Sequence, residues 1–239
     1  MNKATAATTF LATTLACRIV QAQAVTPNWR VNEPIPTVWE NSVDSATHAP
    51  GDKKFILGAR TGFGIPIGKV NGYATVDISY YVVSEIPLWL DIGYMVTPDV
   101  MLGAYGQFAP LFTRNCDIGA SCRGSDVRFG IQAQFLLSPG EKVNPWVGFG
   151  FGYEILSLGE SMTGDEVTAS FRGFELAHLQ AGLDLRATAA IGIGPFVGCS
   201  IGQFSRAKTS NALGSTSGGL ANPVMHEWLE FGVRGVLAL

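Results

Sequence analysis

Residues 127–137 read VRFGIQAQFLL, a run in which apolar side chains alternate with small or polar ones at all but one position. Successive side chains of a β-strand point to opposite faces, so this run is predicted to form a strand with one apolar and one small or polar face. The apolar face comprises Val127, Phe129, Ile131, Ala133, Phe135 and Leu137, and the other face comprises Arg128, Gly130, Gln132, Gln134 and Leu136.

The same alternation continues on both sides of this run, from residue 54 to the C-terminus. It is clear at 54–66 and 146–155 and less regular elsewhere. Strands in soluble proteins average about five or six residues, whereas a tilted strand needs about 9–11 to cross a bilayer, so long strands favour a membrane barrel. Eight strands are predicted, at 54–66, 86–96, 100–112, 127–137, 146–155, 171–187, 191–205 and 227–239.

The connections between these strands alternate in length. Outer-membrane barrels pair short periplasmic turns with long extracellular loops. The fold is therefore predicted to be all-β, an eight-stranded antiparallel transmembrane up-and-down β-barrel with an irregular N-terminal extension. The predicted short links are 97–99, 138–144 and 188–190, and the predicted long links are 67–85, 113–126, 158–170 and 206–226.

One segment leaves the strand count open. Residues 74–83 (ATVDISYYVV) also alternate and would make a ninth strand, with a tenth supplied from around 29–40. An odd count would break the alternation of link lengths. Residues 74–83 are therefore interpreted as the strand-like rim of the first long loop, and ten strands remain the alternative.

The composition of the second face indicates a closed polar interior. The chain is 47% hydrophobic but only 15% charged, and 29 of its 239 residues are glycine. A face exposed to water should carry many lysines and glutamates, whereas this one carries glycines, glutamines and few ionisable residues. An eight-stranded barrel has an interior just wide enough for side chains. A nearly charge-balanced polar network is therefore predicted in the lumen, formed by Arg60, Asp91, Arg128, Glu154, His178, Asp184, Arg186, Glu230 and Arg234.

Aromatic residues gather near the ends of the predicted strands, as in the interfacial girdles of outer-membrane barrels. The alternative is ordinary aromatic packing in a soluble β-sandwich. The predicted girdle comprises Phe55, Phe63, Tyr94, Phe108, Phe112, Phe135, Trp146, Tyr153, Phe171 and Trp228.

The N-terminal residues have the pattern of an export signal. Lys3 supplies a positive start, residues 4–16 are weakly apolar, and residues 22–24 (Ala-Gln-Ala) fit a small-residue cleavage site. Residues 1–24 are therefore predicted to be a signal peptide, residues 25–53 a periplasmic extension and residues 54–239 the barrel. The alternative for the first segment is a helix of the mature protein.

Export delivers the chain to an oxidising compartment, where disulfides persist. Cys116 and Cys122 lie six positions apart in a polar stretch, a spacing that suits a short disulfide-closed loop. The alternative is a metal-binding pair, although the neighbouring sequence holds no histidine or second cysteine pair. Cys199 lies in an alternating apolar run and is expected to be a small buried or lipid-facing residue.

Four runs carry a resemblance to known proteins: IPLWLDIGYMVTPDVMLGAYGQF, the two cysteines ahead of DVRFGIQAQF, NPWVGFGFGYE, and HEWLEFGVRGVLAL. They resemble the outer-membrane β-barrel domain proteins of the porin family, or OmpA/OmpX/OmpW-like small barrels, over about residues 54–239. The resemblance implies the outer membrane of a Gram-negative bacterium, with outer-membrane lipids, lipopolysaccharide and the barrel-assembly machinery as partners. Such barrels usually end in an aromatic residue that this machinery reads, whereas the present chain ends in Leu239.

Several functional classes find no support in the sequence. The formal net charge of −3 offers no basic excess for nucleic acid. The glycine runs at 148–152 and 192–194 do not lie between a strand and a helix, as nucleotide-binding loops must. The three histidines are scattered, with His48 in the extension, His178 on a predicted inward face and His226 at a predicted rim, so neither a metal site nor a cofactor is expected.

The predicted role is structural or surface-interacting at the outer membrane, without catalysis. Porins with an aqueous channel use about 16–18 strands, so eight strands predict a closed or nearly closed lumen. A narrow channel for small solutes or ions is one alternative, and a lipid-modifying enzyme is another. Against the enzyme, His178 is not followed two places on by a serine, as the His-x-Ser motif of lipid A deacylases requires. An extracellular ligand is expected at the loops 113–126 and 206–226.

Overall fold

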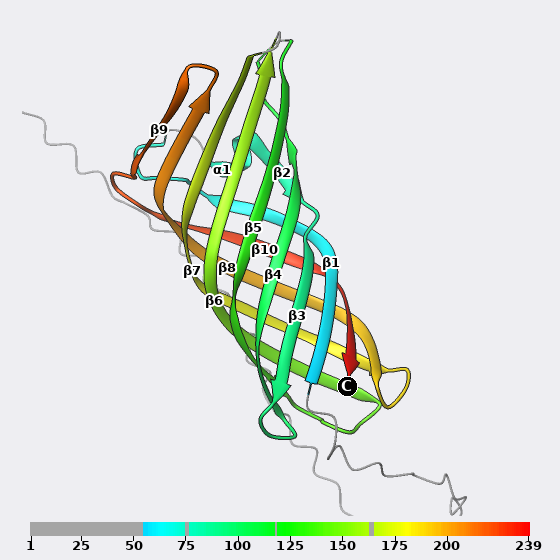
Figure 1. Ribbon diagram of the computed structural model, residues 1–239. Helices are drawn as coiled ribbons and strands as arrows, with labels where there is room; N and C mark the ends of the chain where they lie inside the picture. The colour runs from blue at the N-terminus through cyan, green and yellow to red at the C-terminus, as the bar shows by residue number, and fades with distance from the viewer. Residues whose placement is uncertain (1–54, 75–76, 118, 163–164) are drawn as a thin grey trace, which may run out of the picture. The chain divides into compact units, whose positions relative to one another are not determined.

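The computed structural model describes residues 55–74, 77–117, 119–162 and 165–239, which form an antiparallel β-barrel (Figure 1). The predicted signal peptide and N-terminal extension lie outside the described residues. In the described part of the chain, no helix is long and apolar enough to cross a membrane. The elements are β1 (Phe55–Gly68), α1 (Ile78–Tyr81), β2 (Val82–Glu85), β3 (Leu88–Met95), β4 (Val100–Thr113), β5 (Ser121–Leu136), β6 (Val143–Met162), β7 (Asp165–Arg186), β8 (Ile191–Asn211), β9 (Gly214–Gly219) and β10 (Met225–Ala238).

The barrel closes because its first and last strands pair with each other. β1 and β10 are antiparallel neighbours from Ile56 opposite Ala238 to Gly68 opposite His226. From β4 to β8 each strand pairs with the next along the chain, and β8 in turn pairs with β10. This ring supplies interstrand partners for the backbone N–H and C=O groups, which is the condition for crossing a bilayer with strands.

β2 and β3 together occupy one position in the ring, between β1 and β4. They are separated by Ile86 and Pro87, and a proline has no backbone N–H to donate to a neighbouring strand. The described part of 74–83 forms α1 and the start of β2 rather than a ninth strand. The ring therefore has eight strand positions, and the predicted eight-stranded antiparallel barrel is confirmed.

Two of the predicted long loops are wrong, because strands continue through them. β6 extends to Met162 and β7 begins at Asp165, so most of 158–170 is a tall β-hairpin. Within 206–226, β8 continues to Asn211 and the chain folds back as β9, which pairs with β8. The regular alternation of apolar and polar side chains fades in both regions, although the backbone ladder continues.

The two ends of the barrel differ in their connections. At one end short turns at 96–99, 137–142 and 187–190 join the strands, and the backbone N–H of Leu239 donates to the carbonyl oxygen of Phe55 at 2.8 Å. At the other end stand the tall hairpins and the segment that contains α1. By the pattern of outer-membrane barrels, the end with short turns is periplasmic and the opposite end is extracellular.

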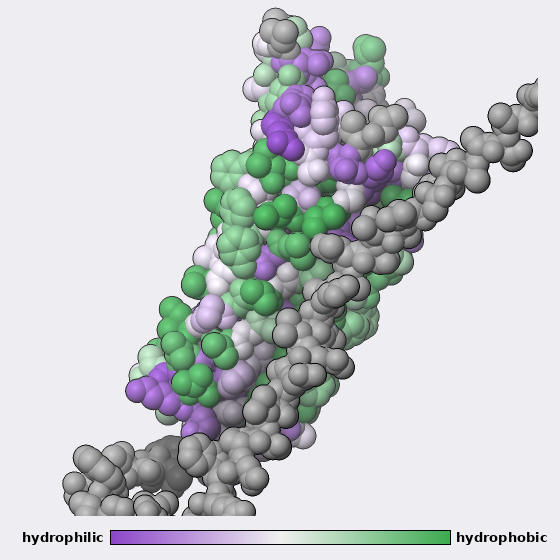
Figure 2. Space-filling model, turned by 180° about the vertical axis from the view of Figure 1, so that it is seen from behind, coloured by the Kyte–Doolittle hydropathy of each residue, from purple (hydrophilic) through white to green (hydrophobic). Residues whose placement is uncertain are grey.

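The apolar face of the barrel is its outer face. Along β3, Leu90 is 71% exposed whereas the next residue, Asp91, is buried. Along β5, Ile131 is likewise exposed whereas the next residue, Gln132, is buried. Figure 2 shows hydrophobic residues spread over the middle of the barrel and hydrophilic ones concentrated toward its ends. A closed barrel with an apolar outer belt has the architecture of an outer-membrane protein, so the soluble β-sandwich alternative is wrong.

The aromatic residues divide between the two faces. Trp146 and Trp228, which were predicted for the girdle, are instead buried in the lumen. They share a face of β6 and β10 with Glu154 and Glu230, because even-numbered residues of both strands point inward there. The predicted girdle residues that are exposed on the outer face are Phe55, Phe63, Tyr94, Phe108, Phe112 and Phe135.

The variant Leu90→Arg is predicted to destabilise the barrel in a bilayer, because it places a charge among lipid chains. Such a substitution near the midplane of a transmembrane barrel costs about 2–4 kcal/mol. Leu213→Arg is the matched control, because Leu213 is 97% exposed at the turn between β8 and β9 and should tolerate the change. Urea unfolding in phosphatidylcholine vesicles measures both, and equal effects would show that Leu90 does not face lipid.

Candidate functional site in the lumen and at the extracellular mouth

Polar side chains project inward from all eight positions of the ring and fill the lumen. Eight of the nine residues predicted for the lumen are buried there. The ninth, Arg186, is half-buried and lines a small cavity of about 70 Å³ at the periplasmic end together with Asp184 and Arg234. The buried polar side chains of the inner face are Arg60, Glu85, Asp91, Gln107, Asp126, Arg128, Gln132, Gln134, Asn144, Glu154, Glu175, His178, Gln180, Asp184, Ser200, His226, Glu230 and Arg234.

Arg128 binds three carboxylates in the centre of this network. Its Nε donates to Asp126 at 2.6 Å, and its two terminal nitrogens donate to Glu230 at 2.7 Å and Glu85 at 2.8 Å. The side chains of all four residues are fully buried. The guanidinium also lies over the ring of Trp228, with its carbon 4.9 Å from the ring centroid. One cation therefore ties β2, β5 and β10 together across the lumen.

Arg60 organises a second group of side chains. It donates to Asp91 at 2.7 Å and also to Gln180, and Gln132 donates to the same oxygen of Asp91 at 2.8 Å. The Arg60 guanidinium lies 4.3 Å from the centroid of the Trp89 ring. Each charged group therefore has hydrogen-bond partners on other strands, which offsets the cost of removing it from water.

Arg234 lies near the periplasmic end. Its Nε is 3.9 Å from Asp184, which is an ion pair without a direct hydrogen bond, and its guanidinium lies 4.1 Å from the ring centroid of Trp146. A Cβ on Gly182 would lie only 2.7 Å from Cζ2 of Trp146. Glycine at that position makes room for the buried indole.

His226 belongs to the lumen rather than to the rim where it was predicted. Its Nε2 lies 2.7 Å from Oε2 of Glu154, and the indole N–H of Trp228 donates to Oε1 of the same carboxylate at 3.0 Å. The side chain of His226 is buried against the ring of Phe204, with 4.0 Å between ring centroids. The register places His226 opposite Gly202, whose missing side chain leaves the space for this contact.

Glu175 gathers a further histidine and a serine. It lies 3.0 Å from Nδ1 of His178, accepts a hydrogen bond from the hydroxyl of Ser200 at 2.6 Å and contacts the hydroxyl of Tyr105. A catalytic serine requires an adjacent base to take its proton. Here the described hydrogen bonds join serine and histidine each to the carboxylate and not to each other.

Three lumen carboxylates were missed by the sequence analysis. Glu85 lies on β2, a segment interpreted as loop. Asp126 lies two residues before Arg128 on β5, which begins earlier than predicted. Glu175 points inward because the register of β7 shifts between Glu175 and Ala177. Only the position of Asp126, at strand spacing from Arg128, offered a signal in the sequence.

The interior is consequently more acidic than the near-balance that was predicted. Among the described buried residues, seven carboxyl groups face three guanidinium groups. The carboxyl groups outnumber the guanidinium groups, and histidines, hydroxyls, amides and an indole N–H supply the remaining hydrogen bonds to these acids. The acids are Glu85, Asp91, Asp126, Glu154, Glu175, Asp184 and Glu230, and the arginines are Arg60, Arg128 and Arg234.

A cavity of about 400 Å³ opens at the extracellular mouth, beyond the polar network. It lies between the segment that contains α1 and the inner faces of β6 and β7. Its floor is an apolar cluster that includes Leu156, two residues beyond Glu154 on β6. The apolar part of the lining comprises Val70, Ala74, Ile78, Leu156, Leu158, Val167, Ala169 and Phe171, and the charged part comprises Asp77, Arg114, Arg123 and Glu160.

The predicted disulfide is present at this mouth. Cys116 and Cys122 are bonded, with 6.0 Å between their Cα atoms, and Cys122 lines the cavity. The predicted loop 113–126 is shorter than expected, because β5 begins at Ser121. Cys199 is half-buried on β8. Among the described residues, no group of three or more histidine, cysteine, aspartate or glutamate side chains is arranged to hold a metal ion.

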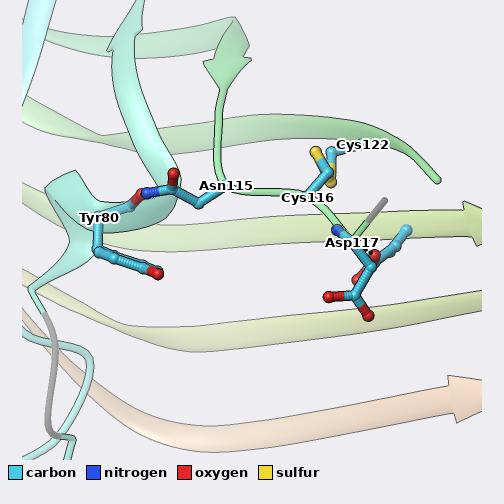
Figure 3. The surroundings of a disulfide bond; sticks show 6 residues. Tyr80, Asn115, Cys116, Asp117 and Cys122 are labelled. Atoms are coloured by element: carbon cyan, nitrogen blue, oxygen red, sulfur yellow. Dashed lines mark hydrogen bonds between the residues drawn. A yellow bond between two sulfur atoms is a disulfide. The ribbon is translucent and has the colours of Figure 1, made fainter. Parts of the chain in front are cut away.

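Hydrogen bonds fix the disulfide loop to its neighbours on both sides. Asn115 donates through its side-chain amide to the carbonyl oxygen of Tyr80 at 2.7 Å, next to the disulfide (Figure 3). The backbone N–H of Asp117 donates to Glu160 on β6 at 3.0 Å. Asn115 and Asp117 are therefore held in place beside the cavity wall.

No protein-family model matches this chain, and no curated protein sequence matches it. Similar solved structures include a major outer membrane protein from Thermus thermophilus, with 13% identity, a TM-score of 0.49 and coverage of 77% of this chain and 99% of that chain. Neisserial surface protein A has 12% identity, a TM-score of 0.42 and coverage of 77% and 97%. The outer membrane protein AlkL has 14% identity, a TM-score of 0.45 and coverage of 87% and 98%. These likenesses concern the fold alone.

The variant Arg128→Met is predicted to lower the free energy of unfolding by about 3–5 kcal/mol, because it leaves three buried carboxylates without their shared cation. Arg123→Met is the control, since Arg123 pairs with Glu166 on the exposed surface, where an ion pair contributes about 0–1 kcal/mol. Urea unfolding in vesicles measures both. An Arg128→Met barrel as stable as the Arg123→Met barrel would show that the carboxylates do not depend on Arg128.

Proposed function

We propose that this chain is a closed outer-membrane β-barrel with a surface-interaction role, which acts through a ligand cavity at its extracellular mouth. The observation that carries the proposal is the contrast between a filled lumen and an open, preformed mouth on the same barrel. Neither conduction nor catalysis is part of the proposed role. The mouth is closed below by the apolar cluster and by the Trp228–Glu154 hydrogen bond.

The packing of the lumen argues against the alternative of a narrow channel. An ion or solute would have to pass Arg128 and its three carboxylates, whose side chains are fully buried. Separating a buried ion pair leaves uncompensated charge in a medium of low dielectric, which is strongly unfavourable. The three indole rings of Trp89, Trp146 and Trp228 occupy further space inside the barrel.

The arrangement around Glu175 argues against the alternative of a lipid-modifying enzyme. Ser200 and His178 are both buried inside the barrel, away from the lipid that such an enzyme must reach. The Ser200 hydroxyl donates to Glu175 and not to His178, so the described hydrogen bonds do not form the serine–histidine pair of such an enzyme. These residues support the barrel by joining β7 to β8.

The chemistry of the mouth favours a small, largely apolar ligand. Cavities of roughly 300–1,000 Å³ with apolar walls and a few polar groups are typical of small-molecule sites. The described mouth fits this size, and its apolar lining comes both from the strands β6 and β7 and from the segment that contains α1. Two arginines and two acids at the rim balance in charge, which favours a neutral ligand over an ion.

Membrane lipids surround the outer belt of the barrel. Lipopolysaccharide is the proposed outer-leaflet lipid, and the barrel-assembly machinery is the proposed partner during insertion. Of the two loops expected to contact an extracellular ligand, 113–126 flanks the proposed site, because residues 113, 114, 122 and 123 line the mouth cavity, whereas no residue of 206–226 is among its described lining.

Planar-bilayer recording of the reconstituted wild-type barrel is expected to show no stepwise current, because the ion-paired lumen offers no path. A general porin added to the same bilayer serves as the positive control. Discrete current steps whose size changes in Glu154→Gln or Arg234→Gln would contradict the proposal and favour the narrow channel.

Addition of toluene to the barrel in nanodiscs is expected to shift the methyl NMR signals of Leu156 and Leu158, since both line the cavity. Ala169→Trp should abolish these shifts by filling the cavity, because Ala169 also lines it. Ala189→Trp, at a periplasmic turn, is the matched control and should preserve them. Shifts confined to lipid-facing leucines such as Leu90 would contradict a ligand site at the mouth.

A further inference from the structure

We propose that the outer face of β7, β8 and β9 binds the phosphate groups of an anionic glycolipid in the outer leaflet. This inference rests on one part of the proposed function, lipopolysaccharide as the outer-leaflet lipid, and it concerns the face of these strands opposite to the mouth cavity. Three cations share that face, namely Arg172, Arg206 and Lys208. Figure 1 shows β7 beside the β8–β9 hairpin at the extracellular end.

The strand register brings the three cations together. Arg172 lies directly opposite Arg206, and Ser170 lies directly opposite Lys208. Phe174 points outward and is 60% exposed, so Arg172, two residues away on the same strand, also faces outward. Side chains directly opposite each other on antiparallel strands start about 4.5–5.5 Å apart, and like charges at that separation repel. An anion held between the two arginines relieves this repulsion.

No carboxylate neutralises this group within the described part of the chain. None of the three cationic side chains takes part in an ion pair or a side-chain hydrogen bond there. Glu166, on the same face of β7, pairs with Arg123 instead. Glu227 on β10 lies opposite Ile201, further toward the middle of the barrel. The cations are therefore available to an external anion.

A shallow pocket of about 480 Å³ lies on this face and collects hydrogen-bond donors. All three cations line it together with Ser170, Ser205 and Ser217, and none of its described lining residues is acidic. The Ser205 hydroxyl donates to the carbonyl oxygen of Arg172, so the cations are the main donors. Phosphate oxygens accept hydrogen bonds, and a guanidinium can donate two of them to one phosphate. The donor set therefore matches a phosphate group.

The height of the pocket on the barrel indicates a lipid headgroup as the source of the phosphate. Phe174 and Leu176 are exposed apolar residues of the outer belt. Arg172 lies two residues from Phe174 on β7, about 6–7 Å closer to the extracellular end. Phosphates of outer-leaflet glycolipids lie at this boundary between acyl chains and water. The cations therefore lie at the level of the lipid phosphates, so one lipid can place its phosphate against them and its acyl chains against the apolar belt.

The test titrates the full-length barrel in detergent micelles with bis-phosphorylated lipid A and, separately, with dephosphorylated lipid A, and measures binding by native mass spectrometry. The phosphorylated lipid is expected to bind the wild type about tenfold more tightly, because charge-assisted hydrogen bonds are lost with the phosphates. Arg206→Gln combined with Lys208→Gln is expected to remove this preference. Lys69→Gln combined with Lys142→Gln removes the same charge elsewhere and should keep it, because neither lysine lines this pocket.

Gel mobility with and without boiling establishes that each variant is folded, and Arg172→Gln alone serves as a second variant if the double variant does not fold. Equal binding of the two lipids by the wild type would overturn the proposal. So would an unchanged preference in the Arg206→Gln, Lys208→Gln variant. Displacement of the lipid by an equal concentration of inorganic phosphate would overturn the lipid source and assign the pocket to a soluble anion. Conductance and toluene binding are unaffected by any of these outcomes, so this inference and the proposed function fail separately.

Discussion

Lipid offers no hydrogen-bond partner to a polypeptide backbone, and the rest of this structure depends on that constraint. The chain meets it by pairing β1 with β10, which closes the ring of described strands. Because strand side chains alternate, closing the ring sends every second side chain inward. The outer set must then be apolar, and the inner set must fill a space only as wide as side chains.

The filled interior moves any function of this barrel to its surfaces. Arg128 and the acids around it cross-link distant strands, so the charges that stabilise the ring also block the lumen. Toward the extracellular end the inward residues change from charged to apolar, as from Glu154 to Leu156 on β6. The preformed cavity begins at this change, where the strands have left the part of the ring that the network fills.

Much of the fold could be predicted from the alternation of apolar and polar side chains, and the predictions that were wrong failed for physical reasons. Alternation located the eight ring positions and the inward placement of residues such as Arg60, because a lipid-facing and a lumen-facing set differ sharply in polarity. Beyond the bilayer that difference fades, so the upper parts of β6 to β9 were interpreted as loops. A register shift within β7 turned Glu175 inward, and no local pattern in the sequence marks such a shift. The mouth cavity combines residues from distant segments, which no single run of sequence reveals.

The wall of the barrel is uneven in height. β6, β7 and β8 contain 20, 22 and 21 residues, whereas β1 and β10 contain 14 each. A bilayer takes up only about 9–11 residues of a tilted strand, and each further residue adds about 3.3 Å of length. The wall formed by β6, β7 and β8 therefore extends further from the membrane than the wall formed by β1 and β10. The chain spends these extra residues on one side of the barrel, so its extracellular surface is asymmetric.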